Sequence, residues 1–152
     1  MSKGVKTIKL DWFNGQKASK ISWKIAYIPG LKYEHGLPHT RNDVIIITKP
    51  THLFTTLVHE KVHLYQKKYP DDVELYLLQK GFERLRKREK KDCIRANPDI
   101  DQWIYKRGKR IYKCVYKSKF PDSIEEVTSF MFEHPFETMA EDIEKLIVTT
   151  FC

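Results

Sequence analysis

The spacing of hydrophobic residues predicts strands in the first third of the chain. Residues 5–12 and 21–28 alternate between apolar and polar positions, which is typical of strands with one buried face. Asn14-Gly15 lies between them and favours a turn, so we expect the two segments to form an antiparallel pair. Residues 31–42 predict a loop, and the β-branched run at residues 43–48 predicts a buried strand.

Helical spacing replaces this alternation after residue 50. Apolar side chains recur at intervals of three and four residues, at Phe54, Leu57, Val58, Val62 and Tyr65. This pattern predicts an amphipathic helix that starts near Thr51 and stops at Pro70. A second apolar stripe, preceded by Asp71-Asp72 as capping residues, predicts another helix that continues to Asn97-Pro98-Asp99.

The last third of the chain contains a predicted hairpin and predicted helices. Residues 102–117 alternate again, and Arg107-Gly108-Lys109 favours a turn between two strands. Ser123 and Glu126 have the spacing of a capping box, which predicts a helix start. Pro135 suits the first turn of a final helix that runs to about Thr149.

These elements predict a single α+β domain over residues 1–152. We expect an antiparallel or mixed N-terminal sheet, a central helix, C-terminal helices and an inserted basic helix and hairpin. Hydrophobic residues make up 41% of the chain, but no run is long enough to span a membrane and the N-terminus lacks a signal-peptide core. We therefore expect an intracellular protein of the cytoplasm or nucleus, neither secreted nor membrane-bound. Three cysteines without C-x-x-C spacing predict neither a disulfide framework nor a metal cluster.

Positive charge is concentrated in the middle of the chain. The net charge is +8, yet residues 79–120 alone hold 15 Lys and Arg against 5 Asp and Glu. Such an excess suits an anionic partner, nucleic acid or an acidic polypeptide, bound through residues 84–119. The aromatic residues here are interleaved with the basic ones, a pattern that fits base stacking but equally fits strands with aromatic rings inside: Trp103, Tyr105, Tyr112 and Tyr116.

The chemistry with the clearest spacing lies on the helix predicted after residue 50. His59, Glu60 and His63 form H-E-x-x-H. Residues four apart lie on one face of a helix, so the two imidazoles can bind one metal ion. Glu60 is rotated about 100° from His59, where it cannot join them as a ligand but can reach a water on that metal. The spacing therefore predicts a zinc site with its own general base.

Two histidines leave a zinc ion short of protein ligands. Catalytic zinc sites take a third ligand from the protein and keep the fourth position for water. The candidates lie at the start of the predicted last helix: Glu133, His134, Glu137 and Glu141. Glu137 and Glu141 are four residues apart, so one can bind the metal while the other hydrogen-bonds the free ring nitrogen of a ligating histidine.

In residues 43–69 the chain resembles the zincin metallopeptidases, whose H-E-x-x-H helix follows a sheet strand that guides the substrate. Residues 133–144 sharpen the resemblance to the gluzincin branch, whose third ligand is a helical Glu with an acidic residue four positions on. That resemblance implies a zincin-like fold, a zinc ion held by His59, His63 and Glu137, and Glu141 as the partner of the first histidine. The chain departs from the branch by having Glu at 141 and by its short length. A resemblance to SprT-like proteases, which act on DNA-bound proteins, would instead make His134 the third ligand.

The expected function is hydrolysis of peptide bonds. Glu60 would take a proton from the attacking water and pass it to the leaving amine. The strand at residues 43–48 would be the sheet edge on which a polypeptide substrate pairs. The sequence offers four donors for the developing oxyanion without choosing between them: Tyr105, Tyr112, Arg110 and His134. An alternative from another class is a non-catalytic basic nucleic-acid-binding protein that retains the zinc helix as a relic.

Overall fold

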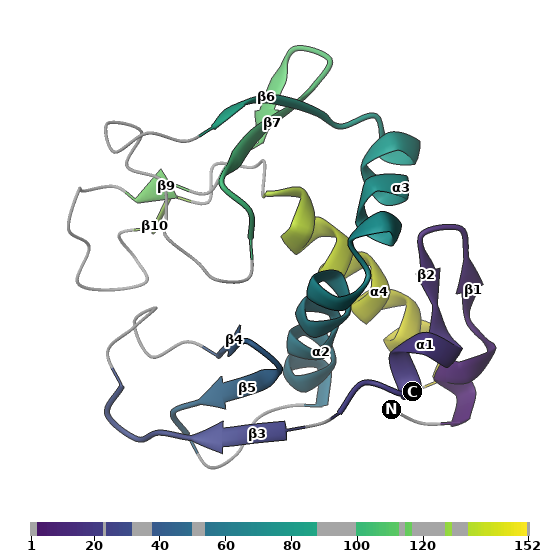
Figure 1. The fold of residues 1–152 in the computed structure, drawn as a ribbon, viewed down its shortest axis with the longest axis vertical. Coiled ribbons are helices and arrows are strands. Elements are labelled where there is room, and N and C mark those ends of the chain that lie inside the picture. Colours follow the sequence, from purple (N-terminus) through teal and green to yellow (C-terminus); the bar gives the residue numbers. More distant parts are fainter. Residues whose placement is uncertain are drawn as a thin grey trace.

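The computed structural model describes residues 3–22, 24–31, 38–49, 54–87, 100–112, 115–116, 127–128 and 134–151. Its architecture is mixed α and β, as the sequence predicts, with helices at the centre and small sheets around them (Figure 1). Residues 88–99 and 121–126, with the predicted end of the second helix and the capping box, lie outside the described residues, as do all three cysteines. No helix in the described parts of the chain is long and apolar enough to cross a membrane.

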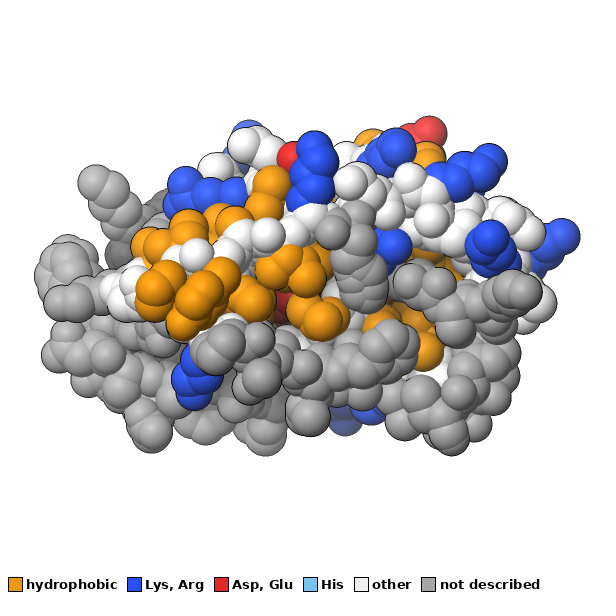
Figure 2. All heavy atoms as spheres, turned by 90° about the horizontal axis from the view of Figure 1, so that it is seen from below, with side chains coloured by type: hydrophobic (Ala, Val, Ile, Leu, Met, Phe, Trp, Pro, Cys, Tyr) orange, Lys and Arg blue, Asp and Glu red, His pale blue; other side chains and the backbone are white. Residues whose placement is uncertain are grey.

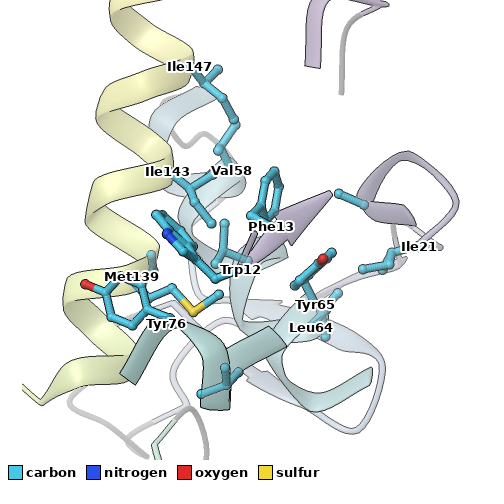
Figure 3. Packing of buried hydrophobic residues seen from close by; sticks show 14 of the residues in the cluster. Trp12, Phe13, Ile21, Val58, Leu64, Tyr65, Tyr76, Met139, Ile143 and Ile147 are labelled. Atoms are coloured by element: carbon cyan, nitrogen blue, oxygen red, sulfur yellow. The ribbon is translucent and has the colours of Figure 1, made fainter. Parts of the chain in front are cut away.

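Helices α2 (Phe54–Lys68) and α4 (Pro135–Phe151) form the centre of the molecule. Both were expected from the sequence, and α4 begins at the predicted Pro135. The two helices pack along one another through apolar residues spaced three or four apart, so that one face of each is buried. In Figure 3, Met139, Ile143 and Ile147 of α4 lie along the side that faces Val58 of α2.

The apolar core continues from these two helices to the N-terminal segment. Trp12 and Phe13 are buried against Tyr76 and Tyr65, with ring centroids 4.8 and 4.7 Å apart (Figure 3). Tyr76, on α3 (Pro70–Lys80), also hydrogen-bonds Thr138 and Asp142 of α4, at 3.0 and 2.9 Å. These bonds satisfy the buried hydroxyl and hold the first turns of α4 in place.

A three-stranded sheet covers another side of α2. Its order is β3 (Lys24–Tyr27), β5 (Val44–Ile47) and β4 (His39–Arg41), with β3 parallel and β4 antiparallel to β5. The prediction that residues 43–48 form an edge strand is wrong, because β5 is central and its continuous Ile run is buried between two neighbours. The predicted loop at residues 31–42 contains β4, and His39 there is buried.

The N-terminal segment differs from the predicted hairpin. It forms the 3-10 helix η1 (Lys3–Thr7), strands β1 (Lys9–Leu10) and β2 (Phe13–Asn14), and the short helix α1 (Gly15–Ser19). Asn14 caps α1, because its Oδ1 accepts from the N–H of Lys17 at 3.1 Å. Asn is favourable at helix N-caps as well as in turns, and here it begins a helix. Within the predicted strand at residues 21–28, residues 24–27 form β3, which pairs with β5 and not with residues 5–12.

Residues 83–87, where the basic part of the predicted second helix begins, form a strand. Gly81 ends α3 with a φ of 77°, a left-handed conformation that glycine adopts without a steric penalty. Strand β6 (Glu83–Lys87) follows and pairs with β7 (Trp103–Arg107), which pairs in turn with β8 (Arg110–Tyr112). The predicted hairpin with its turn at Gly108 is thereby confirmed. A further pair joins β9 (Val115–Tyr116) to β10 (Val127–Thr128), where the sequence had predicted a helix to start.

The sheet that contains β3 leaves apolar side chains exposed. Ile25 and Tyr27 of β3 are 46% and 51% exposed, and Ile28 beyond its end is 41% exposed. Figure 2, which shows the molecule from below, has a group of apolar side chains on this face, with basic side chains mainly above it in the view.

Replacing Gly15 by Ala should destabilise the protein by about 2 to 3 kcal/mol, the cost of forcing atoms into a packed interior. A Cβ at Gly15 would lie 1.8 Å from the carbonyl oxygen of the buried Val5. Urea unfolding monitored by circular dichroism would measure the change. Gln16→Ala, at an exposed position of the same helix, is the matched control and should lie within about 0.5 kcal/mol of wild type. Equal stability of the two variants would contradict the close approach of Gly15 to η1.

Candidate metal centre

Helix α2 places His59 and His63 one turn apart, on the side that faces α4. Their ring centroids are 4.9 Å apart and the rings are nearly perpendicular, at 77°. The side chain of His63 is 1% exposed and that of His59 is 18% exposed. The pair is therefore almost shielded from solvent, with His59 nearer the surface.

Glu137 lies between the two histidines. It sits in the first turn of α4, where its backbone N–H donates to the carbonyl of His134 at 2.9 Å. Its carboxylate oxygens lie 2.9 Å from Nε2 of His59 and 3.2 Å from Nε2 of His63. The structure thus brings together the three side chains that the sequence predicts as ligands, from positions 78 residues apart for His59 and Glu137.

The size of this group fits a zinc ion. One ligand atom from each of the three side chains can be chosen so that all lie within 4.8 Å of one another. Zinc bonds of about 2.0 to 2.1 Å in tetrahedral geometry place neighbouring ligand atoms roughly 3.3 Å apart. The two distances between carboxylate oxygen and ring nitrogen, 2.9 and 3.2 Å, are close to that spacing. Two imidazoles and a carboxylate are also a donor set that catalytic zinc sites use.

His59 has a second acidic neighbour, which is Glu144. Nδ1 of His59 lies 3.1 Å from Oε2 of Glu144. The prediction of Glu141 for this position is wrong, because seven residues from Glu137 bring Glu144 back almost to the same line of α4, while Glu141 is rotated about 40° away. The expectation that the acidic partner of the first histidine lies four residues after the third ligand holds only for one crossing angle of α2 and α4. The sequence does not show that angle.

His63 has an amide as its second neighbour. Nδ1 of His63 lies 2.9 Å from Oε1 of Gln66, and Nε2 of Gln66 donates to the carbonyl oxygen of Phe136 at 2.8 Å. Our sequence reasoning missed Gln66. The available signal was its position three residues after His63 on the same helix, a spacing at which side chains meet.

Each histidine therefore has an oxygen atom beside both ring nitrogens. A neutral imidazole has one N–H donor and one lone pair, so it can satisfy only one of its two oxygen neighbours. Without a cation, each ring must carry a second proton or leave its lone pair facing an oxygen atom. A metal ion among the Nε2 atoms and Glu137 removes this conflict, since Nδ1–H then donates outward on both rings.

The pKa values of the metal-free site reflect this crowding. Burial alone would raise the pKa of Glu137, but the charge of His63 and hydrogen bonds from both histidines hold that pKa well below its ordinary value. Burial alone would lower the pKa of His59, but its hydrogen bond with Glu137 and the charges of Glu137 and Glu60 raise that pKa. The metal-free group is thus an ion pair at mildly acidic pH.

Glu60 lies beside the ligand group and faces another direction. Its side chain is buried, and its charge is close enough to contribute to the raised pKa of His59. Lys67 lies two turns further along the same side of α2 and donates to the carbonyl of Thr40 on β4 at 3.1 Å. The side of α2 that carries Glu60 is therefore the side next to β4, the outer strand of the sheet.

The rival ligand His134 is engaged elsewhere. Its Nε2 lies 2.8 Å from Oδ1 of Asp101, and its Nδ1 accepts from the backbone N–H of Phe136 at 3.2 Å. The ring is 2% exposed and packs edge-on against Tyr105, with centroids 5.1 Å apart. With both nitrogens occupied, His134 is not part of the group around Glu137. Glu133 lies outside the described residues.

The predicted oxyanion donors are also committed to other contacts. Tyr105 is buried and donates its hydroxyl to Asp101, and burial raises its pKa. The hydroxyl of Tyr112, likewise buried, accepts from Nε of Arg107 at 3.0 Å. Arg110 is exposed on β8. These contacts assign none of the four candidates to the metal centre.

The aromatic residues of the basic segment face inward. Tyr105 and Tyr112 are buried, and Trp103 is half-buried under the guanidinium of Arg84, 5.9 Å from its ring centroid. Arg107 covers the ring of Tyr112 at 5.0 Å. The sequence allowed two interpretations of this segment, base stacking and strands with aromatic rings inside. The second interpretation describes these three residues. The side chain of Tyr116 is not among those described.

Comparisons of the chain with family models, curated proteins and solved structures found no match.

The metal-free protein should lose stability as the pH rises from 6 to 8.5. The raised pKa of His59 means that its contribution is complete below about pH 6.5, its unfolded pKa, and is lost as the pH rises through the folded value. The lowered pKa of Glu137 means that its contribution is complete above about pH 4.5 and is lost only in acid. Urea unfolding of chelator-treated protein at both pH values would measure the loss. Glu137→Gln should show a smaller loss, and an equal one would contradict the ion pair.

Proposed function

We propose that this chain is a zinc-dependent metallopeptidase of the zincin type. His59, His63 and Glu137 would hold the ion, and Glu60 would act as general base. The observation that carries the proposal is the convergence of two ring nitrogens and a carboxylate from two helices, with an oxygen acceptor behind each ring. Charged and polar groups are buried together at a cost in free energy unless they are paired, and a divalent cation supplies the missing partner.

The arrangement of elements supports the gluzincin-like version of the proposal. The H-E-x-x-H helix α2 follows strand β5, and the third donor comes from the first turn of a later helix packed on it. This order corresponds to the one implied by the resemblance of residues 43–69 and 133–144 to gluzincins. The contacts of His134 with Asp101 and Phe136 disfavour the SprT-like set of three histidines.

The residues of this chain then have separate tasks in peptide hydrolysis. When bound, zinc would make a coordinated water more acidic and polarise the scissile carbonyl. Glu60 accepts a proton from the attacking water and delivers it to the nitrogen of the leaving amine. Glu144 and Gln66 accept from Nδ1 of His59 and His63, which keeps the Nε2 lone pairs directed inward. Glu60 is buried and its charge contributes to the raised pKa of His59, which supports its assignment as the base.

Strand β4 is the proposed docking edge for an extended polypeptide substrate. It is an outer strand of its sheet among the described residues, and Lys67 ties it to the side of α2 that carries Glu60. An extended peptide can add to such an edge through main-chain hydrogen bonds. This assignment replaces the strand at residues 43–48, whose two edges are already paired.

Protein purified without added metal should contain close to one zinc per chain. Glu137→Ala should lose it, because two histidines alone leave the ion without its carboxylate ligand. Glu144→Ala should weaken zinc binding about 10- to 100-fold through loss of the contact with His59. Metal analysis and competition with a chelating dye would measure these effects. Glu141→Ala, on the same helix, is the matched control and should bind zinc as wild type does. Full zinc content in Glu137→Ala would rule out this ligand set.

Glu60→Gln should keep zinc and lose peptidase activity by at least about 100-fold, since an amide cannot accept the proton from water. A library of unstructured peptides analysed by mass spectrometry would detect cleavage by the wild-type protein. Zinc content of the variant, measured in parallel, separates loss of the base from loss of the metal. Undiminished cleavage by Glu60→Gln would refute the proposed mechanism.

A further inference from the structure

Gln66 connects the two helices of the metal centre through a single buried amide. Gln66 is 3% exposed and lies on α2, one turn beyond His63. The carbonyl oxygen of Phe136 can only accept, so the atom of Gln66 that lies 2.8 Å from it must be the NH₂ group. The amide oxygen then faces Nδ1 of His63 at 2.9 Å, and only a protonated Nδ1 can donate to it. The orientation of the amide thus fixes the position of the proton on the ring.

We infer that Gln66 is a positioning residue that sets the tautomer of His63 and joins this ring to the start of α4. The inference rests on the proposed zinc site, and it concerns a residue outside the ligand set. Phe136 directly precedes Glu137 in the chain. One side chain therefore contacts the second histidine and the backbone beside the third ligand, so a displacement of either helix is transmitted to the other ligand.

Glutamine is the residue type that this place requires. The side chain must accept from His63 and donate to Phe136 at once, and only an amide among side chains of this length provides both groups in fixed positions. A carboxylate would accept from the ring but would turn a buried negative charge toward the Phe136 carbonyl, which is unfavourable. The first histidine differs, because Glu144 beside it is 29% exposed and its charge remains partly solvated.

The two contacts of Gln66 can be tested separately. Gln66→Met retains the approximate size but removes both hydrogen bonds, whereas Gln66→Glu retains an acceptor for His63 and removes the donor to Phe136. Gln79→Met is the matched control. Gln79 is exposed on α3, and its amide hydrogen-bonds Asp11, which is not part of the metal centre. Zinc affinity is measured by competition with a chelating dye, and the tautomer of His63 in metal-free protein by nitrogen NMR of the imidazole.

The expected results depend on which ring nitrogen of His63 carries the proton in each variant. Gln66→Met should bind zinc about 10- to 100-fold more weakly than wild type. At a pH where the metal-free His63 ring carries a single proton, this variant should shift from the Nδ1–H tautomer to the Nε2–H tautomer that donates to Glu137. Gln66→Glu should keep Nδ1 protonated and lose less affinity, and Gln79→Met should resemble wild type in both measurements. A purely structural role of Gln66 would change affinity without changing the tautomer.

Two outcomes would overturn the inference, and neither is the same as failure of the proposed function. The first is Gln66→Met with an unchanged His63 tautomer, whether or not its zinc affinity falls. The second is wild-type His63 with Nδ1 unprotonated in the metal-free protein. If the wild type binds no zinc, the proposed function fails, while the NMR comparison still decides whether Gln66 sets the tautomer.

Discussion

The packing of α2 on α4 is the contact on which the rest of the structure depends. Apolar residues such as Val58 on α2 and Met139 and Ile143 on α4 bury one face of each helix and fix how the two lie together. Polar side chains beside these apolar faces are brought close to one another by the helix packing. Their mutual attraction would be too weak in water to bring them together. His59 and Glu137 are neighbours for this reason, although neither is near the other in sequence. Hydrophobic burial therefore drives the assembly of the site, and the helical spacing of the residues decides which polar side chains meet there.

Around this packing, the polar groups of the centre form a graded series from solvent to interior. Glu144 is partly exposed, His59 less so, and His63 and Gln66 are buried. Charge decreases along the same direction, since His59, nearer the surface, contacts a carboxylate and the buried His63 contacts a neutral amide. This order limits the desolvation of negative charge to Glu137 and Glu60, the groups with chemical roles in the proposed mechanism.

Local patterns in the sequence predicted the elements that carry the chemistry, and tertiary geometry decided the remainder. The apolar spacing before and after His59 predicted α2, and Pro135 marked the start of α4. The prediction of Glu141 was wrong because the partner of a histidine on another helix depends on the crossing of the two helices. Parallel pairing of β3 with β5 depends on contacts between distant segments, so no turn in the sequence indicated it. The prediction that the second helix continues to Asn97 was wrong, because Gly81, with its left-handed backbone, ends α3 and turns the chain into β6.

The separation of the ligands along the chain has a consequence for folding. His59 and Glu137 are 78 residues apart, so the unfolded chain must close a long loop before both can bind one ion, and the entropy of that loop opposes binding. If zinc binds as proposed, the native state would be the only form with high affinity, and zinc at concentrations above its dissociation constant would shift the folding equilibrium toward it. In the proposed zinc form, the concentration of free metal in the surroundings would therefore affect the stability of the folded chain as well as its activity.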